Sequence, residues 1–188
     1  MSGVDFAYPE LKTDCGACSS LCCVALHFDR GEDFALDKPA GVACPNLEPQ
    51  KFACAIHGDL ARSGFGGCIK FDCLGAGQHT VQGVFGGTDW RGHPELLPEM
   101  MEVFRILRRL HQSLEILRYL ELMPLEDSHI QVIDMIKAAF VEPEDGWTLS
   151  SLTDLETDGA FDLYQTALPA FQSLLSDPKA LAALRAAT

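Results

Sequence analysis

Residues 15–23 read CGACSSLCC, and this stretch contains Cys15, Cys18, Cys22 and Cys23. Such a density of cysteine is far above the ordinary usage of this residue in proteins. The chain has 188 residues and 8 cysteines, and the other four follow one at a time at Cys44, Cys54, Cys68 and Cys73. No cysteine occurs after position 73. The sequence therefore predicts that residues 15–73 build a thiol-based structure, which the rest of the chain supports, covers or reports on.

The first cysteines of this cluster have a helical spacing. Cys15, Cys18 and Cys22 stand at i, i+3 and i+7, which would place three sulfurs on one face of a helix. Cys23 lies about 100° around a helix from Cys22, because that angle separates successive helical residues. We expect Cys23 to serve a second site or to fill the core as a small hydrophobic residue. All eight cysteines are candidate metal ligands, and the three spaced ones are the strongest.

Glycine and proline punctuate residues 27–53, which predicts loops with at most short strands at 24–28 or 34–36. Pro45 restricts the residue before it to an extended conformation, so Cys44 is expected to be presented from a turn.

The segment from Cys54 to Cys73 adds two further candidates. His57 forms a C-x2-H pair with Cys54 and is either a fourth metal ligand or a hydrogen-bond donor beside the site. Arg62 is a candidate partner for the negative charge that several thiolates would create.

Residues 74–93 are rich in glycine. Gly75-x-Gly77 is a fragment of a phosphate-binding pattern that lacks the third glycine, so we interpret it as close backbone packing near the cysteines. Residues 81–85 are expected to form a short strand or a hydrophobic lid.

From Pro94 onward the sequence changes to helical periodicity. Apolar residues recur at three and four positions between Met100 and Leu117, and acidic residues beside Arg108 and Arg109 favour a solvated opposite face. Pro124 should end this helix. Further helices are expected over 127–140, 148–157, 161–175 (divided by Pro169) and 178–186. The predicted fold is mainly α, with a loop-rich cysteine module over 1–93 followed by an α-helical bundle over 94–188.

Composition narrows the classes of function. The formal net charge is −13, and both halves are acidic, so we expect no nucleic-acid partner and no membrane surface. The N-terminus lacks the basic and apolar regions of a secretory signal, and no apolar run is long enough to cross a bilayer. These features predict a cytoplasmic protein, where clustered thiols more often bind metal or do redox chemistry than form disulfides.

Three chemistries compete for the cysteines. An iron–sulfur cluster of the [4Fe–4S] type needs a close set of thiolates plus one remote cysteine, which this spacing offers. Two tetrahedral zinc sites would use all eight thiolates, although paired C-x2-C knuckles are absent. A metal-free system with up to four disulfides is the third option, and the cytoplasmic prediction counts against it.

The cysteine pattern resembles a known bacterial family. The segments CGACSSLCC, Cys44-Pro45, CAIH (54–57) and CIKFDC (68–73) are similar to the CxxCxxCC (YkgJ-like) cysteine-cluster family, described as zinc- or iron-chelating. Residues 14–90 look still more similar to the N-terminal part of certain bacterial pentapeptide-repeat proteins, although no such repeat follows. The chain departs from the family at Cys22, which three residues precede rather than two, and at Leu60-Ala61-Arg62, where arginine-proline is usual. The resemblance implies metal binding and no particular reaction.

The sequence therefore favours a cytoplasmic protein that holds a [4Fe–4S] cluster through clustered cysteines, in a redox, sensing or maturation role. Zinc that staples a structural or interaction module is the alternative, with a protein partner bound by the acidic helical half. A further alternative is an enzyme that uses an open position of the cluster on a small substrate.

Overall fold

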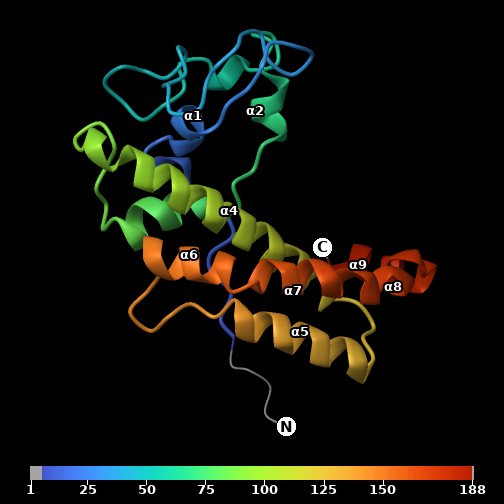
Figure 1. Cartoon of the computed structure of the whole chain (residues 1–188). Helices are drawn as coiled ribbons and strands as arrows, with labels where there is room; N and C mark the ends of the chain where they lie inside the picture. Colours follow the sequence, from blue (N-terminus) through green and yellow to red (C-terminus); the bar gives the residue numbers. More distant parts are fainter. Residues whose placement is uncertain (1–5, 188) are drawn as a thin grey trace. The chain divides into compact units, whose positions relative to one another are not determined.

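The computed structural model describes residues 6–187, and it is mainly helical, as the sequence predicts. No β-strand occurs within these residues, so the short strands expected at 24–28 and 34–36 are wrong; two isolated β-bridges, Phe28–Lys38 and Leu47–Cys54, are present instead. The α-helices are Leu21–Ala25 (α1), Gly66–Lys70 (α2), Ala76–Gln78 (α3), Leu97–Leu120 (α4), Asp127–Ala139 (α5), Leu149–Thr157 (α6), Ala160–Ala167 (α7), Gln172–Ser176 (α8) and Pro178–Ala187 (α9) (Figure 1). Short 3₁₀ turns cover Cys15–Ala17 (η1), His57–Asp59 (η2), Pro94–Leu96 (η4) and Leu168–Phe171 (η5), and a π-helix covers His79–Val84 (η3).

The described chain divides into two compact units. The cysteine unit is the continuous segment Glu10–Arg108, and the helical unit contains the rest. Composition changes at 93/94, but the structural division falls inside α4 at 108/109. The first half of α4 belongs to the cysteine unit because its side chains, such as Met101 and Phe104, line a cavity there.

The cysteine cluster does not lie on a single helix, in contrast to the expectation from its spacing. The turn η1 ends at Ala17, and Ser19 and Ser20 then adopt left-handed conformations with φ of 48° and 53°. Few residues other than glycine adopt this conformation, and it interrupts a right-handed helix. Both serines are buried. The chain restarts as α1, so Cys22 is carried by a different element from Cys15.

A small core holds the loops of the cysteine unit together. It is formed by the buried residues Phe28, Cys44, Leu47 and Phe65. The rings of Phe28 and Phe34 stack at 4.3 Å, and Phe65 meets Phe28 edge-on at 6.2 Å. Aromatic pairs of this kind contribute about 0.5–1.5 kcal/mol beyond the area they bury. The loops are therefore anchored by a few aromatic contacts rather than by regular secondary structure.

The glycine-rich segment after Cys73 is helical, so the strand expected over 81–85 is wrong. The packing role predicted for its glycines is confirmed at two positions. Gly75 has φ of +80°, and a Cβ there would lie 2.2 Å from the carbonyl oxygen of Glu10. A Cβ on Gly77 would lie 2.9 Å from the Cβ of Cys18. Neither position has room for a side chain.

The helical unit follows the sequence prediction closely. Helices α5, α6 and α9 begin and end within two residues of the expected limits, and Pro169 divides the stretch 161–175 into α7, η5 and α8. Helix α7 contacts both α5 and α6. Phe161 on α7 packs against Phe140, with ring centroids 5.4 Å apart. His111 is fully buried, as expected of a core histidine.

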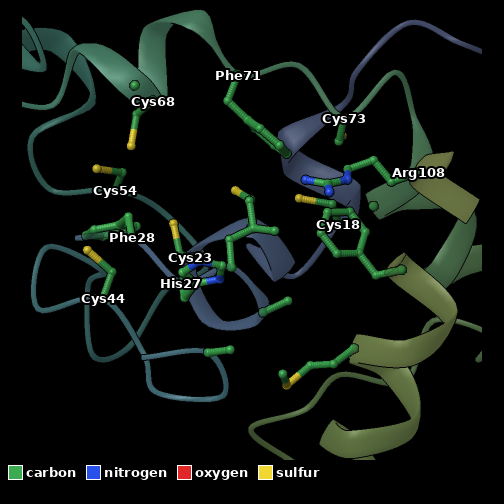
Figure 2. Close-up of a pocket in the computed structure, with 18 of the residues that line it drawn as sticks. Cys18, Cys23, His27, Phe28, Cys44, Cys54, Cys68, Phe71, Cys73 and Arg108 are labelled. Atoms are coloured by element: carbon green, nitrogen blue, oxygen red, sulfur yellow. The ribbon is translucent and has the colours of Figure 1, made fainter. Parts of the chain in front are cut away.

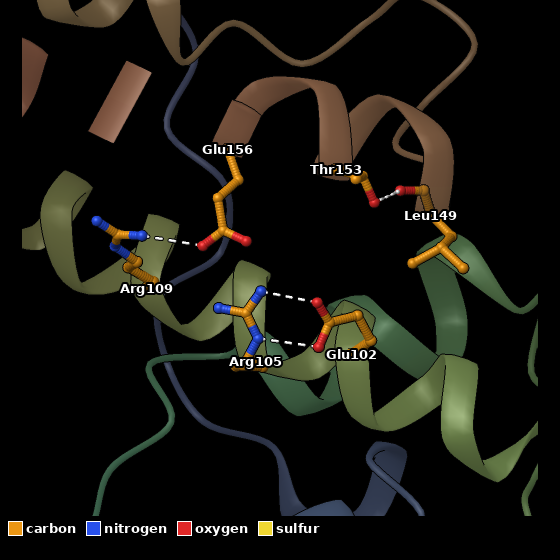
Figure 3. Close-up of polar contacts among 6 residues, drawn as sticks. All are labelled: Glu102, Arg105, Arg109, Leu149, Thr153 and Glu156. Carbon is orange, nitrogen blue, oxygen red and sulfur yellow. Dashed lines mark hydrogen bonds and ion pairs between the residues drawn. The ribbon is translucent and has the colours of Figure 1, made fainter. Parts of the chain in front are cut away.

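Polar contacts also link the elements of the helical unit. Arg109 forms an ion pair with Glu156 at 2.9 Å (Figure 3), and its guanidinium lies 4.1 Å from the ring centroid of Phe161. The N-terminal segment belongs to this unit as well, because the hydroxyl of Tyr8 donates a hydrogen bond to Glu121 at 2.6 Å. Among residues 6–187, no helix is both long and apolar enough to span a bilayer.

Candidate metal centre

All eight cysteines line one cavity of about 1070 Å³ in the cysteine unit. They come from elements that are far apart in sequence: the turn η1, helix α1, the loops before η2, helix α2 and the connection to α3. In Figure 2, Cys23, Cys44, Cys54 and Cys68 surround one part of this cavity, and Cys18 and Cys73 lie in another part. The fold therefore gathers every thiol that the sequence singles out into one hollow.

The cysteines are free thiols that differ in exposure. Cys18, Cys44 and Cys73 are buried, whereas Cys15 and Cys68 are exposed and the other three are half-buried. Free thiols are soft ligands that suit zinc and iron–sulfur clusters, so the donor chemistry of the cavity fits the predicted groups. Within residues 6–187, however, no three potential ligands meet closely enough to form a ready-made metal site.

The adjacent pair Cys22 and Cys23 forms a hydrogen bond between its thiols. Cys22 acts as the donor, and this bond together with burial raises its pKa. Cys23 is the acceptor, and the same bond, with a smaller contribution from Lys38, lowers its pKa to about 7. One member of the pair is therefore held as a thiol while its neighbour is poised to become a thiolate.

Lys38 is a buried ammonium at the edge of this thiol cluster. It is 3% exposed, and its Nζ donates to the carbonyl oxygens of Val24, Pro39 and Val42 at 3.0–3.2 Å. Burial lowers its pKa, whereas any negative charge on the neighbouring cysteines acts to raise it. A buried charge needs such partners to be tolerated, so the three carbonyl oxygens hold the Lys38 ammonium beside the thiols.

The other end of the thiol cluster is organised around Gly77. A Cβ built on Gly77 would lie 3.7 Å from Sγ of Cys18 and 3.8 Å from Sγ of Cys73, so both sulfurs face the same small space. The Cys18 thiol donates to the carbonyl oxygen of Cys15 at 3.3 Å, and the Thr13 hydroxyl lies 3.5 Å from Sγ of Cys73. The missing side chain at position 77 is what lets these thiols approach each other.

Most of the remaining thiols are held in the protonated form. Burial raises the pKa of Cys18 and of Cys68 to about 11, and neighbouring cysteines add to this effect. Burial also raises the pKa of Cys15 and Cys54. These shifts disfavour thiolates in the absence of a cation, because several negative charges would share one cavity.

Several charged side chains line the same cavity, and sequence reasoning placed some of them wrongly. Arg108 is not on a solvated face: it lines the cavity, its guanidinium is 5.8 Å from the ring centroid of Phe71, and its buried Nε has no hydrogen-bond partner within the described chain. Arg105 also lines the cavity and pairs with Glu102 at 2.7 Å (Figure 3). An orphaned buried donor such as Nε of Arg108 fits a site that acquires negative charge.

The two other polar residues singled out in the sequence have different positions. His57 is exposed and lines the cavity, so it remains within reach of a bound group. Arg62 is exposed, pairs with Asp59 and is absent from the cavity lining, which contradicts its expected role beside the thiolates. His27, which the sequence analysis did not select, also lines the cavity. It lies four residues after Cys23, and no spacing signal identifies it.

Comparison with known proteins leaves the function open. No protein-family model and no solved structure matches the chain. An uncharacterized protein of Bacillus subtilis (strain 168), YybG, is 44% identical over 110 residues. The matched region covers 58% of this chain and 39% of YybG, so the chain spans about two-fifths of that relative's length. Its name describes no activity, and the function must be argued from the cavity.

Proposed function

We propose that the cysteine unit binds metal through its thiolates, with an iron–sulfur cluster of the [4Fe–4S] type as the leading candidate. The observation that carries this proposal is the convergence of all eight free cysteines on one cavity. Such a cluster supplies electron transfer or the sensing of oxidants, and thiolates are its usual ligands. Membership of the CxxCxxCC family would agree with this function and is part of the same proposal.

The size and charges of the cavity support a cluster over a single ion. A volume of about 1070 Å³ lies just above the range for small-molecule sites, roughly 300–1000 Å³. Lys38 and Arg108 would offset the excess negative charge of metal-bound thiolates. This chain's own residues thus provide soft ligands, counter-charges and room.

The test is anaerobic purification of the whole chain followed by assays for iron, acid-labile sulfide and zinc, with a visible spectrum. We expect iron and sulfide in equal amounts and thiolate-to-iron absorbance. The Cys18→Ser/Cys44→Ser variant should lose this signal, whereas Ile69→Ala, an exposed substitution beside Cys68, should keep it. A wild-type protein that holds neither iron nor zinc would reject the proposal.

Zinc is the second candidate. Structural zinc is bound by four ligands, commonly thiolates, and often provides much of the folding energy of a loop-rich domain. The cysteine unit has this character, because α1 and α2 contain five residues each. Stoichiometric zinc without sulfide in the assay above would establish this alternative, in which the metal staples an interaction module.

An enzyme is the third candidate, and the lining of the cavity favours it. Apolar side chains such as Phe71, Met101 and Phe104 share the cavity with the thiols and with Arg108. Small-molecule sites typically combine an apolar lining with a few polar groups. A small substrate held beside an open position of the cluster would change the visible or paramagnetic resonance spectrum of the loaded protein.

A further inference from the structure

We propose that the eight cysteines form two separate centres of four thiolates each. The first set is Cys15, Cys18, Cys22 and Cys73, and the second set is Cys23, Cys44, Cys54 and Cys68. This inference rests on the proposed metal binding and names the ligands that the proposal leaves open. The two ligand sets are the same whether each centre holds a zinc ion or an iron–sulfur cluster, and the test below distinguishes these occupants.

The first set gathers around the backbone of Gly77. Sγ of Cys18 and Sγ of Cys73 each lie within 4 Å of a Cβ position on this residue. The Cys18 thiol also reaches the carbonyl oxygen of Cys15. Cys22 is assigned to this set because it stands next to Cys23 on α1, where successive side chains diverge by about 100°.

The second set is joined by backbone contacts between loops. The amide of Cys44 donates to the carbonyl oxygen of Cys23 at 2.9 Å. The antiparallel bridge between Leu47 and Cys54 brings the next cysteine alongside. Cys68 completes the set, because its side chain points from α2 toward Cys54 in Figure 2. Figure 2 draws these four side chains around one part of the cavity.

The pair Cys22 and Cys23 separates the two sets. Both residues lie on α1, and successive side chains on an α-helix diverge by about 100°. One thiol of the pair can therefore turn to each centre without distortion of the helix. Because the two residues are adjacent on this helix, the two sets meet at α1. This geometry explains why the sequence contains two adjacent cysteines.

The chemistry of loading is the same for each set. When four thiols coordinate, four S–H bonds break, four protons pass to solvent and four sulfur–metal bonds form. A divalent metal group with four thiolates then carries two excess negative charges. Lys38 lies beside the second set, because its Nζ donates to the carbonyl oxygen of Val24, the residue after Cys23, at 3.2 Å. It is placed to offset part of that excess.

The test begins with wild-type protein, which avoids variants that fail to fold. Metal-free full-length chain is titrated with Co²⁺ as a probe and then pulse-labelled with N-ethylmaleimide. Native mass spectrometry counts the ions bound, and peptide mapping finds the protected cysteines. We expect about two ions at saturation, and we expect that cysteines gain protection in two groups of four that match the sets. Protection of cysteines from both sets by a single first ion would overturn the proposal.

Paired variants provide the second measurement. Cys68→Ser and Cys73→Ser lie five residues apart but belong to different sets, so each should halve the metal content and the double variant should abolish it. Cys54→Ser/Cys68→Ser, within one set, should lose no more than either single variant. Complete loss in both single variants, with the circular dichroism of the helices retained, would show one shared centre. That outcome would reject the two-set inference and leave metal binding intact.

Reconstitution with iron and sulfide distinguishes the occupants. Two clusters predict about eight iron and eight sulfide per chain, whereas two zinc sites predict about two zinc ions without sulfide. About one zinc ion per chain, or about four iron and four sulfide with the spectrum of a single [4Fe–4S] cluster, would mean one centre and would contradict the inference, whereas the spectrum of [2Fe–2S] clusters at this iron content would mean two. Absence of all metal would instead overturn the proposed function itself.

Discussion

The two units of the chain are stabilised in different ways. The helical unit buries large apolar side chains such as Phe140 and Phe161 between helices of ordinary length. The cysteine unit, apart from its share of α4, has short helices, a small aromatic core and many thiols around a cavity. Helices of five residues are not stable by themselves in water. If the thiols bind metal as proposed, the metal would stabilise the cysteine unit as a hydrophobic core stabilises the helical unit, and each prediction below tests that contrast.

Metal loading should give the largest difference between the units. Structural zinc contributes about 10–16 kcal/mol to folding in small zinc-binding domains, which is comparable with the whole stability of a typical domain. Amide hydrogen exchange should therefore slow strongly over residues 15–73 on loading, with little change over 127–187. Equal protection of both regions would mean that the units are not energetically distinct.

Truncation of a core side chain in the helical unit should destabilise that unit and leave the cysteine unit unchanged. Phe161→Ala removes a side chain that is 1% exposed, and such changes cost about 3–5 kcal/mol. The chain has 2 tryptophans, and each unit contains one: Trp90 and Trp147. In a Trp147→Phe background, Trp90 fluorescence monitors the cysteine unit, and its denaturation should be unchanged by Phe161→Ala. In a Trp90→Phe background, Trp147 fluorescence monitors the helical unit and should show its loss of stability. Leu175→Ala, at an exposed position, is the matched control.

Replacement of the buried ammonium should destabilise the cysteine unit. Lys38→Met leaves three carbonyl oxygens without their donor, and the expected cost is about 2–3 kcal/mol. The Trp90 signal measures this loss. The pKa of Cys23 should also rise, because the charge of Lys38 helps to lower it. A Lys38→Met protein of unchanged stability would show that this charge does not support the loops.

The space beside Gly77 offers a smaller and more local perturbation. Gly77→Ala would place a Cβ 2.9 Å from the Cβ of Cys18, and overpacking of this kind costs about 1–3 kcal/mol. We expect lower metal content with the Trp147 transition unaffected. Gly58→Ala is the control in the same unit, because nothing lies within 4 Å of its Cβ position. An equal loss of metal content in Gly77→Ala and Gly58→Ala would contradict the importance of close packing between Gly77 and Cys18.

The pH dependence of thiol reactivity should give the smallest effect. Thiolate is the reactive form, and its fraction rises as pH passes the pKa. In metal-free protein, alkylation of Cys23 should therefore increase up to about pH 8 and then level off, because its pKa is about 7. Alkylation of Cys68 should continue to increase beyond pH 10, since its pKa is about 11. Identical profiles in a site-resolved labelling experiment would contradict the asymmetry between these thiols.

The two units also differ in how far the sequence predicts them. Periodicity and proline positions predict the helical unit well because its structure is local: Pro169 divides the stretch 161–175 as expected. The cysteine order predicts a thiol site, and the cavity gathers those thiols. Its internal arrangement depends on features without a sequence signal, namely the left-handed serines at 19–20 and the approach of Arg108. The spacing of Cys15, Cys18 and Cys22 predicts one face of a regular helix, but the left-handed serines interrupt the helix between Cys18 and Cys22.

The glycines after Cys73 bear on how relatives of this chain can be found. The string C-L-G-A-G at 73–77 joins one cysteine to two positions where any side chain would collide with Glu10 or Cys18. Cysteines recur in many unrelated chains, but this steric exclusion belongs to one backbone arrangement. A search profile that weights Gly75 and Gly77 together with the eight cysteines should therefore separate chains that share this cavity from other cysteine-rich sequences.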